Sequence, residues 1–209
     1  MISPYKGKFR VSQEYKGVSH QGIDLVGIDS KNIYSIFEGK VEVASNADPD
    51  GFGIYVRMRI TTGPLKGYVC YYGHLSKVKV KVGQTIKVGE LLGVEGSTGH
   101  STGSHLHLEV RKTTTYATYQ NICTITGIPN KIGVYSTAVA NATKYVVKSK
   151  VWIRTEPKMG GATRIGILPK GRKVTIVKGS AKKSGNYTFV TVKVGKYSFY
   201  ANKNKLKAA

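Results

Sequence analysis

The chain has 209 residues, of which 40% are hydrophobic and 21% charged, and its formal net charge is +22 at pH 7. This length allows one domain of ordinary size and a smaller one, each with its own core. No stretch approaches the roughly 20 apolar residues of a transmembrane helix, so membrane insertion is not expected. Cys70 and Cys123 are too few for a disulfide framework, and we expect both to be buried thiols.

Residues 9–111 have a β-rich pattern with no long helical period. Short runs such as 40–44 and 54–60 are bounded by Gly, Asp, Asn or Pro, which is typical of strands. Residues 78–89 alternate and then turn twice at glycine, which predicts two short strands that meet at a corner. Residues 113–143 lose this alternation, and we place a closing segment there and then a linker at 136–143.

Alternation returns in the last part of the chain, in 151–154, 173–178 and 189–194, with Gly, Ser and Asn turns between these runs. Short strands of this kind predict a small β-barrel. This part is also strongly basic: residues 144–209 contain 17 lysines and arginines against one acidic residue, Glu156. Such an asymmetry of charge points to a polyanionic partner.

Two short segments contain candidate ligands: one has a histidine and an aspartate, and the other has two histidines. Three residues separate His20 from Asp24, and Gly22 lies between them. His105 and His107 stand at i and i+2. In a strand these two positions share a face, about 6.6 Å apart, so both rings can enter one cleft.

This spacing suggests a metal site. An extended segment from His20 to Asp24 would span about 13 Å, whereas zinc bonds to nitrogen and oxygen are about 2 Å long, so we expect Gly22 to supply a bend. One imidazole from the second pair would complete three protein ligands and leave an open fourth position. That arrangement is typical of a catalytic zinc site rather than a structural one.

The same residues fall into three ordered blocks. These are His20-x-x-x-Asp24, then Tyr72-Gly73-His74-Leu75-Ser76, then the glycine-rich segment 96–109 that contains His105-Leu106-His107. The blocks resemble the signature motifs of the lysostaphin-like metallopeptidases of family M23, and the resemblance covers roughly residues 9–135.

The resemblance implies an antiparallel all-β peptidase domain over residues 1–135. It also implies one zinc ion per chain, with His20, Asp24 and His107 as ligands. His74 and His105 would then be the catalytic pair that does not bind the metal, and which of the two acts as general base is left open.

Five neighbouring positions have less certain roles. Ser104 stands where the family usually has proline and Leu108 where it usually has phenylalanine, which bears on substrate fit more than on activity. His100 lies in the glycine-rich loop and is interpreted as a loop residue or a substrate contact. Glu109 could orient a metal ligand or be a surface carboxylate. Tyr15 could donate to an oxyanion or simply pack.

Residues 144–209 resemble the bacterial SH3-like (SH3b) repeat, through the segments 151–157 and 165–176. Modules of that family usually bind peptidoglycan, and the positive charge adds anionic wall polymers such as teichoic acids as expected partners. A merely solvated surface and non-specific nucleic-acid binding are the alternatives. The sequence contains no base-reading motif, so we expect no specific nucleic acid partner.

These expectations combine into a monomeric zinc endopeptidase that cuts the cross-bridge or stem peptide of peptidoglycan. Because the first residues lack the apolar run of a signal peptide, the layout resembles a bacteriophage endolysin that is made in the host cytoplasm and released to act on the wall. One alternative is a catalytically inactive regulator of other wall hydrolases, although every ligand is present. Another is a scaffold built on 82–89, which lacks a lipoyl-type lysine.

Overall fold

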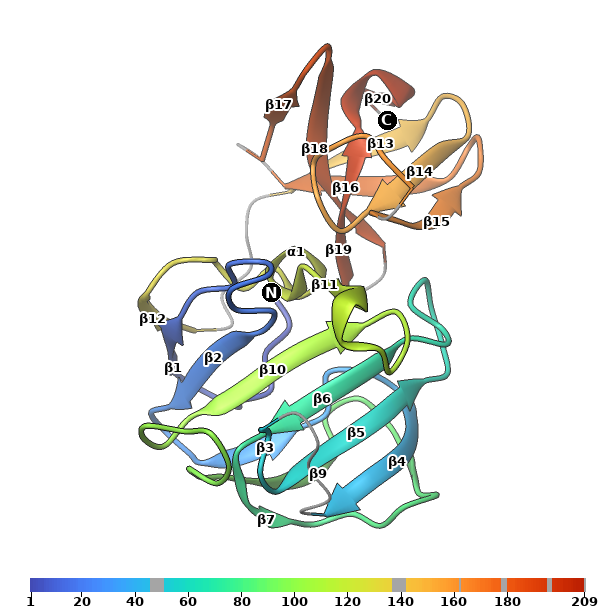
Figure 1. Ribbon diagram of the computed structural model, residues 1–209. Coiled ribbons are helices and arrows are strands. Elements are labelled where there is room, and N and C mark those ends of the chain that lie inside the picture. Colours follow the sequence, from blue (N-terminus) through green and yellow to red (C-terminus); the bar gives the residue numbers. More distant parts are fainter. Residues whose placement is uncertain (46–50, 137–141, 162, 178–179, 195–196, 209) are drawn as a thin grey trace. The chain divides into compact units, whose positions relative to one another are not determined.

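The computed structural model describes residues 1–45, 51–136, 142–161, 163–177, 180–194 and 197–208 (Figure 1). Antiparallel strands are the main regular structure of this part of the chain, so the predicted all-β class is confirmed. The helical elements there are short, and none is long and apolar enough to cross a membrane. They are η1 (Tyr116–Thr118), α1 (Ile122–Thr126) and η2 (Lys203–Lys205).

The chain divides into two compact units, which are described separately. The larger unit comprises Ser3–Ile122 and Pro129–Thr137, and the smaller unit comprises Met1–Ile2, Cys123–Ile128 and Ala138–Ala209. The predicted domain limits of 1–135 and 144–209 stay predictions, and most of the predicted linker, 136–143, lies outside the described residues.

The larger unit contains a nine-stranded antiparallel sheet. Its strands, in spatial order, are β12 (Gly133–Tyr135), β1 (Phe9–Gln13), β2 (Ile23–Gly27), β10 (Leu106–Arg111), β6 (Val69–Gly73), β5 (Tyr55–Ile60), β4 (Gly39–Ser45) and β8 (Thr85–Ile86), and β11 (Tyr119–Gln120) pairs with β10. A second sheet has three strands, in the order β3 (Asn32–Tyr34), β9 (Leu91–Glu95) and β7 (Leu75–Val78).

Period-2 alternation in the central strands separates the core from the opposite face of the sheet. Leu106, Leu108 and Val110 on β10 are fully buried. The intervening residues of β10 therefore point to the other face, because successive side chains of a strand alternate. β2 and β6 are the neighbours of β10 in the sheet, so this second face is built from strands that are far apart in the sequence (Figure 1).

The expected strands at 40–44 and 54–60 correspond to β4 and β5. The prediction for 78–89 is wrong in its first half, since β7 ends at Val78 and only Thr85–Ile86 forms the second strand. The alternating valines and lysines suit extended backbone, but residues 79–84 form a corner instead. There the Gly83 amide donates to the Val41 carbonyl, across to another strand.

The smaller unit is an eight-stranded antiparallel sheet with its own core. The spatial order is β15 (Arg164–Leu168), β14 (Val151–Arg154), β19 (Tyr197–Asn202), β18 (Tyr187–Val194), β16 (Lys173–Val177), β13 (Ala142–Val147) and β20 (Leu206–Ala208), and β17 (Lys182–Ser184) pairs with β18. Ile153, Phe189 and Phe199 are fully buried within this unit. Cys70 and Cys123 are both buried, as expected, and neither forms a disulfide.

Candidate functional site

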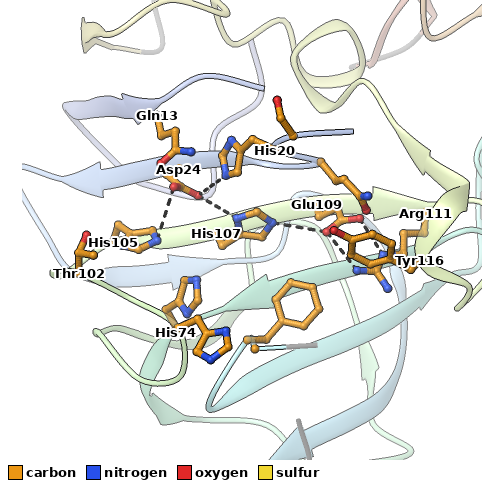
Figure 2. A pocket seen from close by; sticks show the side chains of 15 residues that line it. Gln13, His20, Asp24, His74, Thr102, His105, His107, Glu109, Arg111 and Tyr116 are labelled. Atoms are coloured by element: carbon orange, nitrogen blue, oxygen red, sulfur yellow. Dashed lines mark hydrogen bonds and ion pairs between the residues drawn. The ribbon is translucent and has the colours of Figure 1, made fainter. Parts of the chain in front are cut away.

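The second face of β10 forms the floor of a cleft of about 320 Å³ (Figure 2). His107 lies opposite Asp24 of β2 and opposite Gly73 of β6 in the strand register. All five predicted site residues line the cleft, so the three sequence blocks meet there. The lining residues are Gln13, Ser19, His20, Gln21, Asp24, Gly51, Phe52, His74, His100, Thr102, His105, His107, Glu109, Arg111 and Tyr116.

Three of these side chains converge on one point. Asp24 Oδ1 lies 3.2 Å from His20 Nε2 and 2.8 Å from His107 Nδ1. One ligand atom from each residue lies within 4.8 Å of the other two, a spacing that could hold a metal ion. Two imidazole nitrogens and one carboxylate oxygen form the donor set of a three-ligand zinc site.

The expected bend at Gly22 takes a different form. The turn before it brings His20 back, since the His20 amide donates to Gly17 O and the Lys16 amide donates to His20 O. Gly22 instead provides space: a Cβ there would meet both His107 Cε1 and Leu108 O at 2.7 Å. A glycine is therefore required where β2 passes the His107 ring.

The hydrogen bonds of the two imidazoles fix which nitrogen of each ring faces Asp24. His20 Nδ1 lies 2.6 Å from the Glu14 carbonyl oxygen, and a carbonyl only accepts, so Nδ1 carries a hydrogen and Nε2 is the ring nitrogen that faces Asp24. His107 Nε2 faces Glu109 Oε2 at 3.4 Å, which leaves Nδ1 toward Asp24. Both rings thus present a nitrogen to the same point.

The close contacts among His20, Asp24 and His107 shift the pKa values of Asp24 and His107. Burial alone would raise the pKa of Asp24, but hydrogen bonds from His107 and His20 outweigh it and hold the pKa well below its usual value. Burial alone would lower the pKa of His107, but the hydrogen bonds to Asp24 and Glu109 raise it to about 9. Asp24 is therefore a carboxylate at neutral pH, and His107 is a cation whenever no metal ion displaces its proton.

His74 and His105 face each other beside this group, with ring centroids 4.6 Å apart. His74 is the only non-glycine residue with positive φ, at 61°, in the part of the chain that the structure describes. Its amide donates to Phe52 O and its Nδ1 donates to Thr98 O at 2.8 Å. Backbone strain of this kind persists only where the surroundings enforce it.

The two rings share one tautomer. His105 Nδ1 donates to the Gly103 carbonyl at 2.8 Å, so both rings keep Nε2 as the acceptor atom. His105 Nε2 lies 3.6 Å from Asp24 Oδ2. Burial lowers the pKa of His74, so this ring is neutral at neutral pH. Two fixed, basic nitrogens therefore stand beside the point at which the three candidate ligands meet.

Arg111 is a residue of the cleft that sequence reasoning missed. Its guanidinium is buried, stacks 4.5 Å from the Tyr71 ring centroid and donates through Nε to Glu109 Oε1 at 2.7 Å. Glu109 in turn reaches His107, so it orients a candidate ligand rather than lying on the surface. The sequence did contain a clue to its position: His107, Glu109 and Arg111 stand at i, i+2 and i+4 of one strand, so their side chains share a face.

His100 and Tyr15, whose roles the sequence left open, differ in their position relative to the cleft. His100 lines the cleft beside Gly51 and is exposed, which suits contact with a substrate. Tyr15 is absent from the described lining; its ring packs 6.3 Å from Tyr119, and its backbone exchanges hydrogen bonds with Asn130. The packing alternative for Tyr15 is thus the one that the geometry favours.

Comparison with known proteins gives a family match that falls within the larger unit. Residues 18–121 match the model described as Peptidase family M23. The chain is 36% identical over 117 residues to an uncharacterized metalloprotease of Buchnera aphidicola, covering 51% of this chain and 30% of that protein. It is 35% identical over 91 residues to the peptidoglycan DD-endopeptidase ShyC of Vibrio cholerae, covering 44% and 20%.

A third relative is the glycyl-glycine endopeptidase ALE-1 of Staphylococcus capitis, 34% identical over 93 residues, covering 44% of this chain and 25% of that protein. The chain thus spans less than a third of the length of each of these relatives.

Proposed function

Because residues 18–121 match Peptidase family M23, we propose that this chain is a member of that family and a zinc-dependent endopeptidase that hydrolyses peptide bonds of bacterial peptidoglycan. The observation that carries the proposal is the convergence of His20 Nε2, Asp24 Oδ1 and His107 Nδ1 at the floor of an open cleft. Two of the relatives are a peptidoglycan DD-endopeptidase and a glycyl-glycine endopeptidase, which supports the substrate class.

The residues present fit one zinc ion per chain. The donor set would be two imidazole nitrogens and one carboxylate oxygen: Glu14 O holds His20 Nδ1 and Glu109 holds His107 Nε2, so His20 Nε2 and His107 Nδ1 are the nitrogens that would bind the ion once deprotonated. Three protein ligands would leave one coordination position for water or substrate. A zinc ion there would supply Lewis acidity, polarising the scissile carbonyl and lowering the pKa of water.

His74 and His105 would handle protons and the developing negative charge. Each holds Nδ1–H against a backbone carbonyl and leaves Nε2 free to accept a proton from the attacking water or to return one to the leaving amine. Once protonated, either ring could donate to the oxyanion. The lowered pKa of His74 keeps its acceptor form populated at neutral pH.

For the smaller unit we propose an SH3-like barrel over residues 144–209 that holds the enzyme on the wall. Its 17 basic residues against one acidic residue support attraction to teichoic acids and similar anionic polymers.

A hydrolase joined to a basic binding module suits an endolysin of bacteriophage origin, acting as a monomer on the wall after release from the host cytoplasm. The opposing idea of an inactive regulator is not favoured, because all five site residues are present.

The test is digestion of purified peptidoglycan followed by mass spectrometry of the soluble fragments. We expect the zinc-loaded protein to release peptide-bond cleavage products, the chelated protein to release none, and added zinc to restore release. The new termini identify the bond as one in the cross-bridge or in the stem. Release that persists after complete chelation, or cleavage of glycan bonds alone, would refute the proposal.

A further inference from the structure

The smaller unit has a pocket of its own, with a volume of about 110 Å³. β14 forms one wall, the segment after it forms a second, and the end of β19 with η2 forms the third. The lining residues are Lys150, Val151, Trp152, Arg154, Met159, Asn202 and Lys205. None of them is acidic, although a protein surface usually mixes both signs of charge.

Arg154 is a buried cation without a buried anion to balance it. The residue is only 3% exposed, and its guanidinium donates to neutral acceptors: Gly160 O at 2.6 Å and Thr163 Oγ1 at 3.1 Å. No carboxylate of the described residues forms an ion pair with it. Glu156, the single acid of residues 144–209, pairs with Lys158 at 2.6 Å instead. A buried charge is costly unless an opposite charge compensates it.

The rim of the pocket adds further donors. Lys150 and Lys205 are exposed and are brought together by the backbone bond from Lys148 N to Lys205 O at 2.8 Å. Asn202 uses its Oδ1 to accept from Asn204 N, so Nδ2 is the atom that can donate to a ligand. The pocket therefore presents donors and positive charge from two sides, the β14 side through Lys150 and Arg154 and the β19 and η2 side through Asn202 and Lys205.

One wall is apolar. Trp152 is 39% exposed and Met159 is 47% exposed, and the Arg164 guanidinium lies 5.0 Å from the Trp152 ring centroid. Burial and the nearby Arg164 lower the pKa of Arg154, which is the response of a cation that lacks a counter-charge. An anion joined to a carbon skeleton would satisfy the donors and cover the exposed ring.

From these contacts we infer that the pocket binds a phosphodiester group of an anionic wall polymer; this rests on the proposed wall-binding role of the smaller unit. Arg154 and the two rim lysines would hold the phosphate oxygens, and Trp152 would pack against the polyol or sugar between successive phosphates. A polymer with a repeating charge is favoured over single carboxylates of the stem peptide, because 17 basic residues against one acid complement a repeating anion.

Trp152 allows a direct test, since it is the only tryptophan of the chain. We would titrate the full-length protein with purified poly(glycerol phosphate) at about 150 mM salt, where exposed charges are largely screened, and record tryptophan fluorescence. The variant Lys150→Gln/Lys205→Gln removes the rim charges. Lys182→Gln/Lys183→Gln removes the same charge from exposed positions of β17 that do not line the pocket and serves as the matched control.

We expect a saturable fluorescence change, about tenfold weaker binding for the pocket variant and less than roughly a twofold change for the control. Equal losses in both variants, or no fluorescence change, would overturn the inference. So would tighter binding of stem peptide or of single-stranded DNA than of the polymer. Digestion of peptidoglycan stripped of phosphate polymers, measured on the same samples, reports the hydrolase separately, so the two proposals fail independently.

Discussion

Glu109 Oε2 lies 3.4 Å from His107 Nε2, on the opposite side of the imidazole from Asp24. The His107 ring is thus held between two carboxylates, one of which faces the proposed metal position while the other fixes the tautomer. Glu109 itself is held by the buried Arg111, so the ring orientation is set by the next two residues on the same face of β10.

The first prediction follows from this contact. Glu109→Gln keeps the size of the side chain but removes its charge, so His107 becomes a weaker ligand. We expect zinc affinity to fall by about 10- to 100-fold, measured by competition with a chelating dye. Circular dichroism checks that the fold survives. Unchanged affinity in a folded variant would show that Glu109 serves only to balance Arg111.

The second prediction concerns pH. The pKa of His107 in the folded, metal-free protein is about 9, above its ordinary 6.5, so protonation of His107 stabilises the fold fully below pH 6.5 and this stabilisation is lost as pH rises through about 9. Zinc must displace that proton, so its apparent affinity should rise about tenfold per pH unit between those values.

Calorimetric zinc titrations in buffers of different ionisation enthalpy measure this release. We expect about one proton to leave per zinc bound at pH 7.5. Thermal unfolding of the metal-free protein should in parallel occur at lower temperature at pH 9 than at pH 6.5. A binding reaction that releases no proton would contradict the assignment of His107 as a ligand.

The third prediction concerns Ser104, which precedes His105. Its hydroxyl donates to Glu95 at 2.6 Å, and the same buried carboxylate accepts from Tyr5 and Lys31 at 2.6 Å and from the Gly27 amide at 2.7 Å. Ser104→Ala removes one of four donors to Glu95. It should cost about 1 kcal/mol of stability.

The same substitution should also loosen the backbone that carries His105. We expect kcat to fall while zinc content and KM stay the same, because His105 touches the reaction but not the metal. Ser104→Thr, which restores a hydroxyl, should recover activity. A loss of zinc in Ser104→Ala would instead mean that the Glu95 contacts support the ligands.

The fourth prediction tests the close approach at Gly22. Gly22→Ala places a methyl group against His107 and Leu108 O, so β2 and β10 must separate locally. We expect a loss of about 1–3 kcal/mol in unfolding free energy and weaker zinc binding. Gly161→Ala is the control, since a Cβ there meets nothing within 4 Å. If both variants bind zinc like the unmodified protein, the steric argument is wrong.

The all-β class and the grouping of five site residues were predictable because each signal is local. His105 and His107 share strand parity, and the blocks around His20 and His74 are contiguous in sequence. Arg111 could not be predicted as a buried cation, because an arginine at the end of a strand is usually solvated. Its burial depends on Phe52, Tyr71 and Glu109, which come together only in the folded sheet.

Two further features also depend on tertiary contacts. The Ser104–Glu95 hydrogen bond joins the glycine-rich segment to the end of β9, a contact that forms only in the folded unit. Residues 79–82 alternate like a strand, yet they lie in a corner rather than in a strand of either sheet. Alternation predicts an extended backbone, but it does not supply a partner strand.

The most direct measurement is the zinc content of the purified protein and of two ligand variants, determined by elemental analysis together with peptidoglycan digestion. The unmodified chain should contain roughly one zinc ion and release peptide fragments, whereas folded Asp24→Ala and His107→Ala should contain almost none and release none. Equimolar zinc or undiminished fragment release in either folded variant would contradict the proposed site.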